Sequence, residues 1–154
     1  MEQLMDYKNK IALLLLQSEE IVNALIEGTN LTADDDLLYE VIFPTRQSFD
    51  TETKVGSYIF YEITSTNMGS DEYWKYSRIT FYIVVHNDLL RTELHGVRTD
   101  YLESEIDKIF NNNADFGLGK LKFVNDDAQA LDAKYYYRSI TYKVTDSNNS
   151  LCRK

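Results

Sequence analysis

The stretch YIVVHNDLLRTELHGVRTDYLESEIDKIFNNNADFGLGKLKFV, residues 82–124, decides the fold. Its first residues belong to a strand, because side chains alternate with a period of two from Ser77 to His86. One face of this strand carries Ile79 and Phe81, and the other carries Tyr82 and Val84. Apolar or aromatic groups on both faces are typical of a strand that is covered on both sides. The pattern therefore predicts a central strand of a sheet.

A helix and a second strand follow at once. Asp100 precedes Glu103 by three residues, a spacing that favours reciprocal capping of a helix N-terminus. Apolar residues then recur at helical spacing, at Leu102, Ile106, Ile109 and Phe110. The glycines Gly117 and Gly119 predict a turn with backbone angles that a side chain would resist. Another strand begins within Lys120–Asn125.

Four pieces of this segment form a recognisable series. They are a hydrophobic strand ending in His86, LLRT (89–92), GVRTDYLESEID (96–107) and DFGLGKLKF (115–123). In this series the chain resembles the small neck and tail proteins of long-tailed bacteriophages, in particular the tail-terminator (tail-completion) group. The likeness is densest over these thirty-odd residues and elsewhere is one of topology.

The resemblance implies a structural virion protein with no enzymatic activity, no catalytic residue, no bound metal and no cofactor. Tail terminators are α+β subunits that close into a ring, a hexamer, on the head-proximal end of the tail tube and stop its polymerisation. The implied partners are further copies of the chain, the tail-tube protein and a head-side connector or neck protein. DNA would pass through the lumen without specific binding. The implied location is the tail or neck of a virion assembled in the bacterial host cytoplasm. Head-closure and connector proteins are similar in size, and they remain an alternative.

Composition sets further bounds. The 154 residues predict one domain, residues 1–146, with a flexible Ser/Asn-rich C-terminal tail, residues 147–154. A net charge of −9 opposes a general duplex-binding role, which depends on Lys and Arg. The longest apolar run, Ile11–Leu16, is far shorter than the roughly 20 residues of a membrane span, so no membrane partner is expected. A single Cys excludes an internal disulfide.

The remaining elements complete an α+β fold. We expect a single four-stranded antiparallel or mixed sheet with two helices packed on one face. The other face then carries tyrosines in some combination of Tyr58, Tyr82, Tyr135, Tyr137 and Tyr142. The expected ranges are a helix at Met5–Ile26, a short helix at Leu37–Ile42, strands at Lys54–Thr66, Ser77–His86, Lys120–Asn125 and Lys134–Thr145, and a hairpin connection at Asn67–Tyr76.

Aromatic side chains mark the candidate interface. Tyrosine is common where a surface is covered by a partner, although it is also a good sheet residue. Trp74 favours an interface more strongly, because binding hot spots are enriched in Trp and Tyr. We therefore expect the open sheet face, the Asn67–Tyr76 hairpin and the Phe43–Asp50 loop to form contacts. The predicted interface residues are Phe43, Arg46, Phe49, Tyr73, Trp74, Tyr76, His86 and Arg91.

Other chemistry is poorly supported by spacing. His86 and His95 flank Asp88 and Glu93, so a metal-dependent hydrolase can be imagined, yet neither HxxxH nor HxH spacing is present. The acidic run 34–36 lacks the ligand spacing of a calcium loop and instead suits the start of a short helix. A protein-binding module that acts as a monomer is a further alternative. The basic residues Lys120, Lys122, Lys134, Arg138 and Lys143 either face an acidic partner or belong to a mixed surface.

Overall fold

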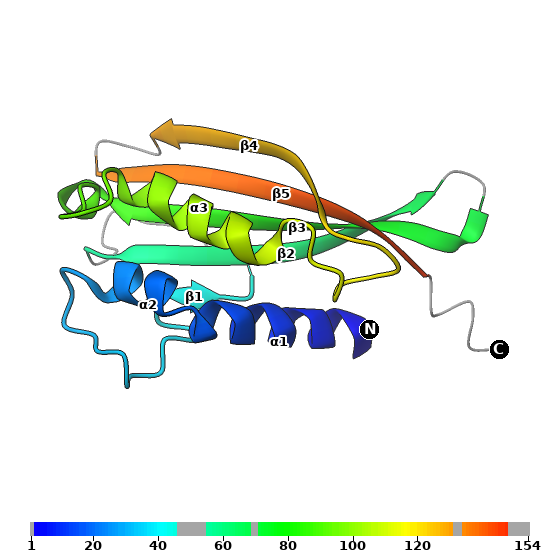
Figure 1. The fold of residues 1–154 in the computed structure, drawn as a ribbon, viewed down its shortest axis with the longest axis horizontal. Helices are drawn as coiled ribbons and strands as arrows, with labels where there is room; N and C mark the ends of the chain where they lie inside the picture. Colours follow the sequence, from blue (N-terminus) through cyan, green and yellow to red (C-terminus); the bar gives the residue numbers. More distant parts are fainter. Residues whose placement is uncertain (1, 46–54, 69–70, 131–133, 148–154) are drawn as a thin grey trace.

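The alternating segment forms the middle strand of a five-stranded mixed sheet in the computed structural model (Figure 1). The structure describes residues 2–45, 55–68, 71–130 and 134–147. The strands lie side by side in the order β1-β2-β3-β5-β4. In chain order the elements are α1 (Glu2–Gln17), α2 (Glu19–Ile26), β1 (Ile42–Phe43), β2 (Ser57–Met68), β3 (Asp71–His86), the 3-10 turn η1 (Asn87–Leu89), α3 (Arg98–Phe110), β4 (Lys122–Ala130) and β5 (Tyr135–Ser147).

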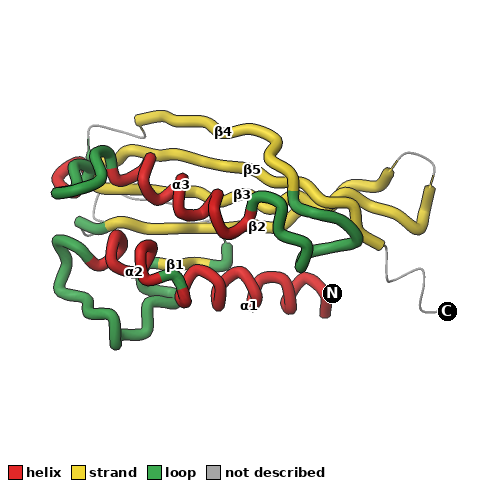
Figure 2. The backbone as a smooth tube through the Cα atoms, in the orientation of Figure 1, coloured by secondary structure: helices red, strands yellow, loops and turns green. Residues whose placement is uncertain are grey.

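All three helices pack on one face of the sheet (Figure 2). Two buried tyrosines on the strands that flank β3 join the sheet to the helices. The Tyr61 hydroxyl on β2 donates to the Lys8 carbonyl of α1 at 2.9 Å, and the Tyr142 hydroxyl on β5 donates to Asp107 of α3 at 2.6 Å. Phe81 of β3 lies between them, with its ring centroid 4.6 Å from that of Phe110. The expected α+β class with helices on one face is therefore confirmed.

The first helical segment is two helices rather than one. Ser18 has extended backbone angles, and its hydroxyl accepts a hydrogen bond from the Ile21 amide at 3.3 Å, which makes it the N-cap of α2. Ser is a favoured N-cap because its oxygen satisfies an amide that has no partner within the helix. The predicted continuous helix Met5–Ile26 is wrong at this residue, although both halves are helical. No helix among the described residues is long and apolar enough to cross a membrane.

The predicted short helix at Leu37–Ile42 is wrong. Instead the chain turns tightly through Tyr39, which has a φ of 66°, and Ile42 then pairs in parallel with Ile59 of β2. The carboxylate of Asp36 accepts the Leu38 amide at 3.1 Å, so it stabilises a turn and not a helix N-terminus. This two-residue strand, β1, is the fifth strand that the expected four-stranded sheet lacks.

The strands are longer than their apolar patterns indicate. β2 and β3 stay paired as far as Met68 and Asp71, so most of the predicted Asn67–Tyr76 connection is strand. This part of the hairpin, residues 64–68 and 71–76, projects past the helices, and we call it the arm (Figure 1). β4 likewise continues beyond the predicted Asn125 to Ala130.

The expected capping box of α3 is also wrong. The helix begins at Arg98, and its N-cap is Val97, whose side chain makes no capping hydrogen bond. Asp100 and Glu103 lie inside the helix, where both contact Arg138 of β5. The two carboxylates that the spacing predicted to cap the helix therefore form ion pairs with a residue of the sheet instead.

Candidate protein-interaction surfaces

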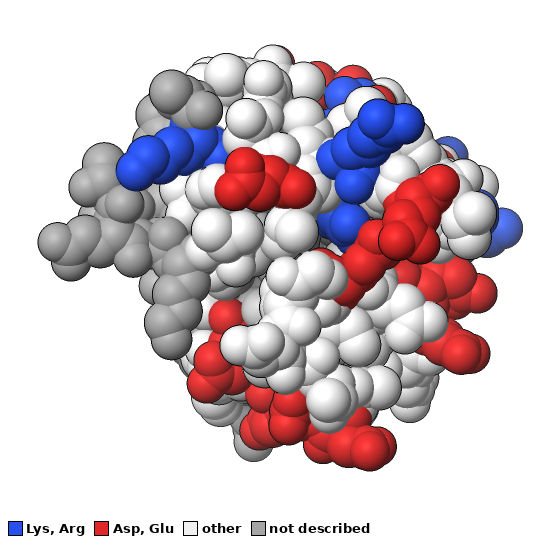
Figure 3. All heavy atoms as spheres, turned by 90° about the vertical axis from the view of Figure 1, so that its left-hand side faces the viewer, with Lys and Arg blue, Asp and Glu red and all other residues white. Residues whose placement is uncertain are grey.

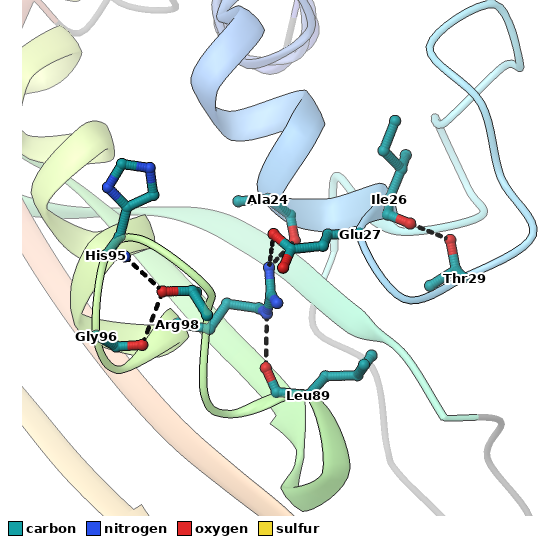
Figure 4. A network of polar contacts seen from close by, with 9 residues as sticks. Ala24, Ile26, Glu27, Thr29, Leu89, His95, Gly96 and Arg98 are labelled. Atoms are coloured by element: carbon teal, nitrogen blue, oxygen red, sulfur yellow. Dashed lines mark hydrogen bonds and ion pairs between the residues drawn. The ribbon is translucent and has the colours of Figure 1, made fainter.

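Arg98, in the GVRTD segment (96–100), connects the elements that meet where α3 begins (Figure 4). The guanidinium of Arg98 is buried, with 1% of the residue exposed. It donates to the carbonyls of Leu89 at 2.6 Å and Ala24 at 2.7 Å, and to the carboxylate of Glu27 at 3.3 Å. Arg98 therefore joins the end of α2, the turn η1 and the first turn of α3.

The loop before α3 is a closed turn with an exposed tip. The Thr92 hydroxyl donates to the Gly96 carbonyl at 2.9 Å and accepts the His95 amide at 2.8 Å (Figure 4). The His95 ring stacks on Tyr101 with centroids 4.1 Å apart. Leu94 is left 85% exposed. Val97, three residues later, is 43% exposed, so this turn presents two exposed apolar side chains that are a candidate contact for a partner.

The two histidines make separate local contacts. The Nδ1 atom of His86 accepts the Asp88 amide at 3.1 Å, and its ring lies edge-on to Tyr135. His95 instead stacks on Tyr101. Across residues 2–45, 55–68, 71–130 and 134–147 there is no group of three or more His, Cys, Asp or Glu side chains that could hold a metal ion.

Most of the predicted tyrosine face exists. By register, Tyr58, Tyr82, Tyr135 and Tyr137 lie on the side of the sheet away from the helices, whereas Tyr142 points toward α3. The first three of these are at most 9% exposed. Tyr82 also donates its hydroxyl to Glu62 at 2.7 Å. These rings are therefore mostly covered within the chain itself.

The predicted interface residues do not converge on one site. Tyr73 and Trp74, 58% and 39% exposed, lie on the arm, with Tyr76 at its base. His86 and Arg91 lie at the other end of the sheet, where Arg91 bridges to Val97. Phe43 packs on Phe60 beside β2, with centroids 5.4 Å apart. Arg46 and Phe49 lie outside the described residues.

Sequence reasoning missed a groove between α3 and β4, which we call the acidic groove. Its carboxylates are Asp100, Glu103, Asp107 and Asp126, and Arg138 lies among them. Arg138 contacts Asp100 at 3.2 Å, Glu103 at 2.8 Å and Asp126 at 3.0 Å. The contact between the Nε atom of Arg138 and Glu103 is an ion pair, because the geometry at Nε does not meet that of a hydrogen bond. Burial raises the pKa of Glu103, and Arg138 opposes that rise. The groove encloses about 320 Å³ and includes the half-exposed ring of Phe123.

A second charged feature lies on the other face of the same strands. In register, Arg78 of β3 is opposite Lys143 of β5, and Lys143 is opposite Lys122 of β4. We call these three side chains the basic row. None of them forms an ion pair with a described residue, and Lys143 lies 3.7 Å from the centre of the Tyr76 ring. The predicted clustering of basic residues thus holds for Lys122 and Lys143, while Arg138 faces the helices.

Charge is also unevenly distributed at the end of the molecule where α3 begins. Acidic side chains gather in the lower and right-hand parts of this view, and most of the visible basic side chains lie in its upper half (Figure 3). The net charge of −9 is therefore not spread evenly over the surface.

Comparison with known proteins gives one result. A search of curated proteins finds no match to the chain. A family model described as YomW matches residues 11–144, which includes β1 to β4, the helices α2 and α3, most of β5 and the C-terminal part of α1. YomW is a family name derived from a Bacillus phage. The chain belongs to the YomW family and is a phage-associated protein.

Proposed function

We propose that this protein is a structural subunit of the phage tail, a tail terminator that forms a ring at the head-proximal end of the tail tube. The YomW match supports a phage origin, and the one-sided α+β fold fits the subunit type that the sequence resembles. Its action would be geometric: the ring occupies the end of the tube, blocks further addition of tube subunits and presents its other side to the neck.

The observation that carries the proposal is the presence of exposed apolar side chains at both ends of the long sheet. Tyr73 and Trp74 project from the arm at one end. Leu94 and Val97, 85% and 43% exposed, lie at the other end before α3. A protein that joins a tail tube to a neck needs two such separated surfaces, and exposed apolar patches commonly mark protein contacts.

The test uses polymerisation of the tail-tube protein encoded with this chain. Added to growing tubes, the wild-type protein should stop elongation and give tubes with one capped end in negatively stained micrographs. The variant Tyr73→Ala/Trp74→Ala removes the aromatic contacts of the arm, and Leu94→Ser removes the apolar tip of the opposite end. Because the two surfaces face different partners, the variant of the surface that binds the tube should abolish capping. The variant of the other surface should still cap tubes but should fail to bind the head-side protein.

Tubes of unchanged length and uncapped ends at saturating protein would overturn the proposal. Binding to the head-side connector without any binding to the tube would assign the chain to head closure instead. The same assay run with Val55→Ser is a matched control, since Val55 is 48% exposed but lies outside the arm and the Leu94 turn. This variant should cap tubes as the wild type does.

A further inference from the structure

We propose that the basic row of one copy of this chain binds the acidic groove of a second copy. The inference rests on the proposed ring and names the contact by which neighbouring subunits join. It concerns two surfaces on opposite faces of the β4–β5 edge of the sheet, namely Arg78, Lys143 and Lys122 on one face and the groove around Arg138 on the other.

No carboxylate of the described residues pairs with the basic row. Arg78, Lys143 and Lys122 are cross-strand neighbours, and like charges directly opposite in a sheet are destabilising. The two outer members, Arg78 and Lys122, are exposed. Their repulsion is unrelieved by any ion pair with a described residue. The carboxylates of a bound partner would attract these three cations and offset the repulsion among them.

The acidic groove has the matching excess. Three of its four carboxylates contact the guanidinium of Arg138, and the fourth, Asp107, accepts the Tyr142 hydroxyl, so one cation faces four anions. The side chains of Asp100 and Asp126 remain 58% and 40% exposed, and they are within reach of an incoming cation. Phe123 at the groove offers apolar area beside the charges. Complementary charge of this kind selects partners and fixes their register.

The placement of the two surfaces determines the type of assembly. Asp126 is opposite Ile140 on the helix side of the sheet, whereas Lys122 and Lys143 project from the other side. A two-fold dimer brings the same surface of both copies together, so it cannot easily match patches on opposite faces. A front-to-back contact uses both patches of every copy. Such heterologous contacts produce rings when the rotation closes.

A second copy is a better occupant than nucleic acid. Three cations in a row can bind phosphates, yet a chain of net charge −9 repels a polyanion at longer range. The matching acidic surface is present on the same chain. Nucleic acid is a distinct outcome of the test. If the wild type binds duplex in a salt-sensitive way, and the row variant loses this binding but assembles normally, the contact between copies is overturned.

The first variant reverses the row without harming the sheet. Arg78→Glu/Lys122→Glu leaves Lys143 between two glutamates, so each cross-strand pair becomes oppositely charged. We expect a Tm at least as high as that of the wild type. Like charges facing each other across the interface should raise the midpoint concentration of assembly by at least about tenfold, measured by light scattering after size exclusion.

The second variant reverses the groove. Asp100→Lys/Asp126→Lys should weaken assembly to a similar extent. Because this pair also contacts Arg138, Ser104→Lys/Asn111→Lys serves as a second version that adds positive charge to the groove and keeps every ion pair. Mixing the row variant with the Asp100→Lys/Asp126→Lys variant makes both contacts of an alternating ring complementary again. The mixture should therefore assemble when neither component does so alone.

The control Lys10→Glu/Lys120→Glu makes the same change in net charge at exposed sites outside both surfaces, and it should assemble normally. Folded row and groove variants that assemble at the wild-type midpoint, or a mixture that fails to recover, would overturn this contact and leave the ring standing. A wild-type protein that is monomeric at every concentration, and forms no carbodiimide cross-links between isotopically distinct copies, would overturn the ring and the contact together.

Discussion

Arg98 shows how far a single residue can depart from the environment typical of its type. Arginine is almost never fully buried unless it is paired, yet Arg98 is 1% exposed and binds groups from three elements. The sequence marks this residue only as part of GVRTD. No periodicity could reveal its burial, because its partners Ala24 and Glu27 are more than seventy residues away.

Replacing Arg98 should therefore destabilise the fold. Arg98→Ala leaves the Ala24 and Leu89 carbonyls without their donor, and we expect a loss of about 3 kcal/mol in the free energy of unfolding. Urea denaturation followed by circular dichroism would measure it. Arg91→Ala, at an exposed site in the adjacent loop, should change stability by no more than about 0.5 kcal/mol. Equal effects of the two substitutions would contradict the structural role of Arg98.

Tyr7 gives a prediction for alkaline pH. Its hydroxyl donates to Asp146 at 2.9 Å, and burial, followed by that carboxylate, raises the pKa of Tyr7 from 10.0 to about 12. A folded-state pKa above the unfolded value means that the contribution to stability is complete below about pH 10 and is lost as the pH rises through about 12. Burial also raises the pKa of Tyr61 and Tyr142, so alkaline unfolding should be steep.

The contribution of Tyr7 can be isolated with Tyr7→Phe, which has no hydroxyl proton to lose. The difference in unfolding free energy between the wild type and this variant should be largest near pH 8 and should shrink toward pH 12. Tyr39→Phe, at a 64% exposed ring, should show no such trend. A constant difference for Tyr7→Phe over this pH range would show that the hydrogen bond to Asp146 does not control the titration.

At the scale of elements, strong periodicity was a reliable guide and short elements were not. The central strand and α3 could be predicted because Ile79 to Val85 and Leu102 to Phe110 repeat at clear periods. β1 has only two residues, so no period can identify it. The extension of β2 and β3 into the arm depends on cross-strand pairing of polar residues, which leaves no apolar alternation in the sequence.

The turn before β4 yields a matched pair of glycine substitutions. Neither Gly117 nor Gly119 has a positive φ, so the predicted special backbone angles are wrong for both. A Cβ on Gly117 would lie 2.6 Å from the Thr145 carbonyl oxygen of β5, whereas one on Gly119 would meet nothing within 4 Å. We therefore expect Gly117→Ala to cost about 2 kcal/mol and Gly119→Ala to be nearly neutral in thermal denaturation. The reverse order would refute this packing of the turn against β5.

The arm should matter for assembly more than for folding. Trp74 is 39% exposed at the projecting end of β3 and is not part of the buried core, so Trp74→Ala should cost less in unfolding free energy than the about 3–5 kcal/mol of a core tryptophan. If the arm contacts a neighbouring subunit or the tail tube, the same substitution should weaken that binding at least about tenfold. Unchanged binding with an intact fold would remove the arm from the interface.

At the scale of the whole molecule, charge and family limit what the sequence alone can say. The net charge of −9 opposes a general duplex-binding role, but this single number does not reveal the row of three cations on one face of the sheet or the acidic groove on the other. The separation of these surfaces depends on strand register, because Arg138 and Lys143 project from opposite faces of β5. The candidate interface residues also separate into two ends of the sheet only once the fold is known.

The most direct test of the account is the mass of the wild-type protein in solution, measured by light scattering across a wide range of concentration and at low and high salt. We predict a closed oligomer of a single size, six copies of the 18.0 kDa chain, that dissociates as salt screens the charged contact. A strict monomer at all concentrations and salt levels, both alone and in the presence of tail tubes, would contradict the ring on which the account depends.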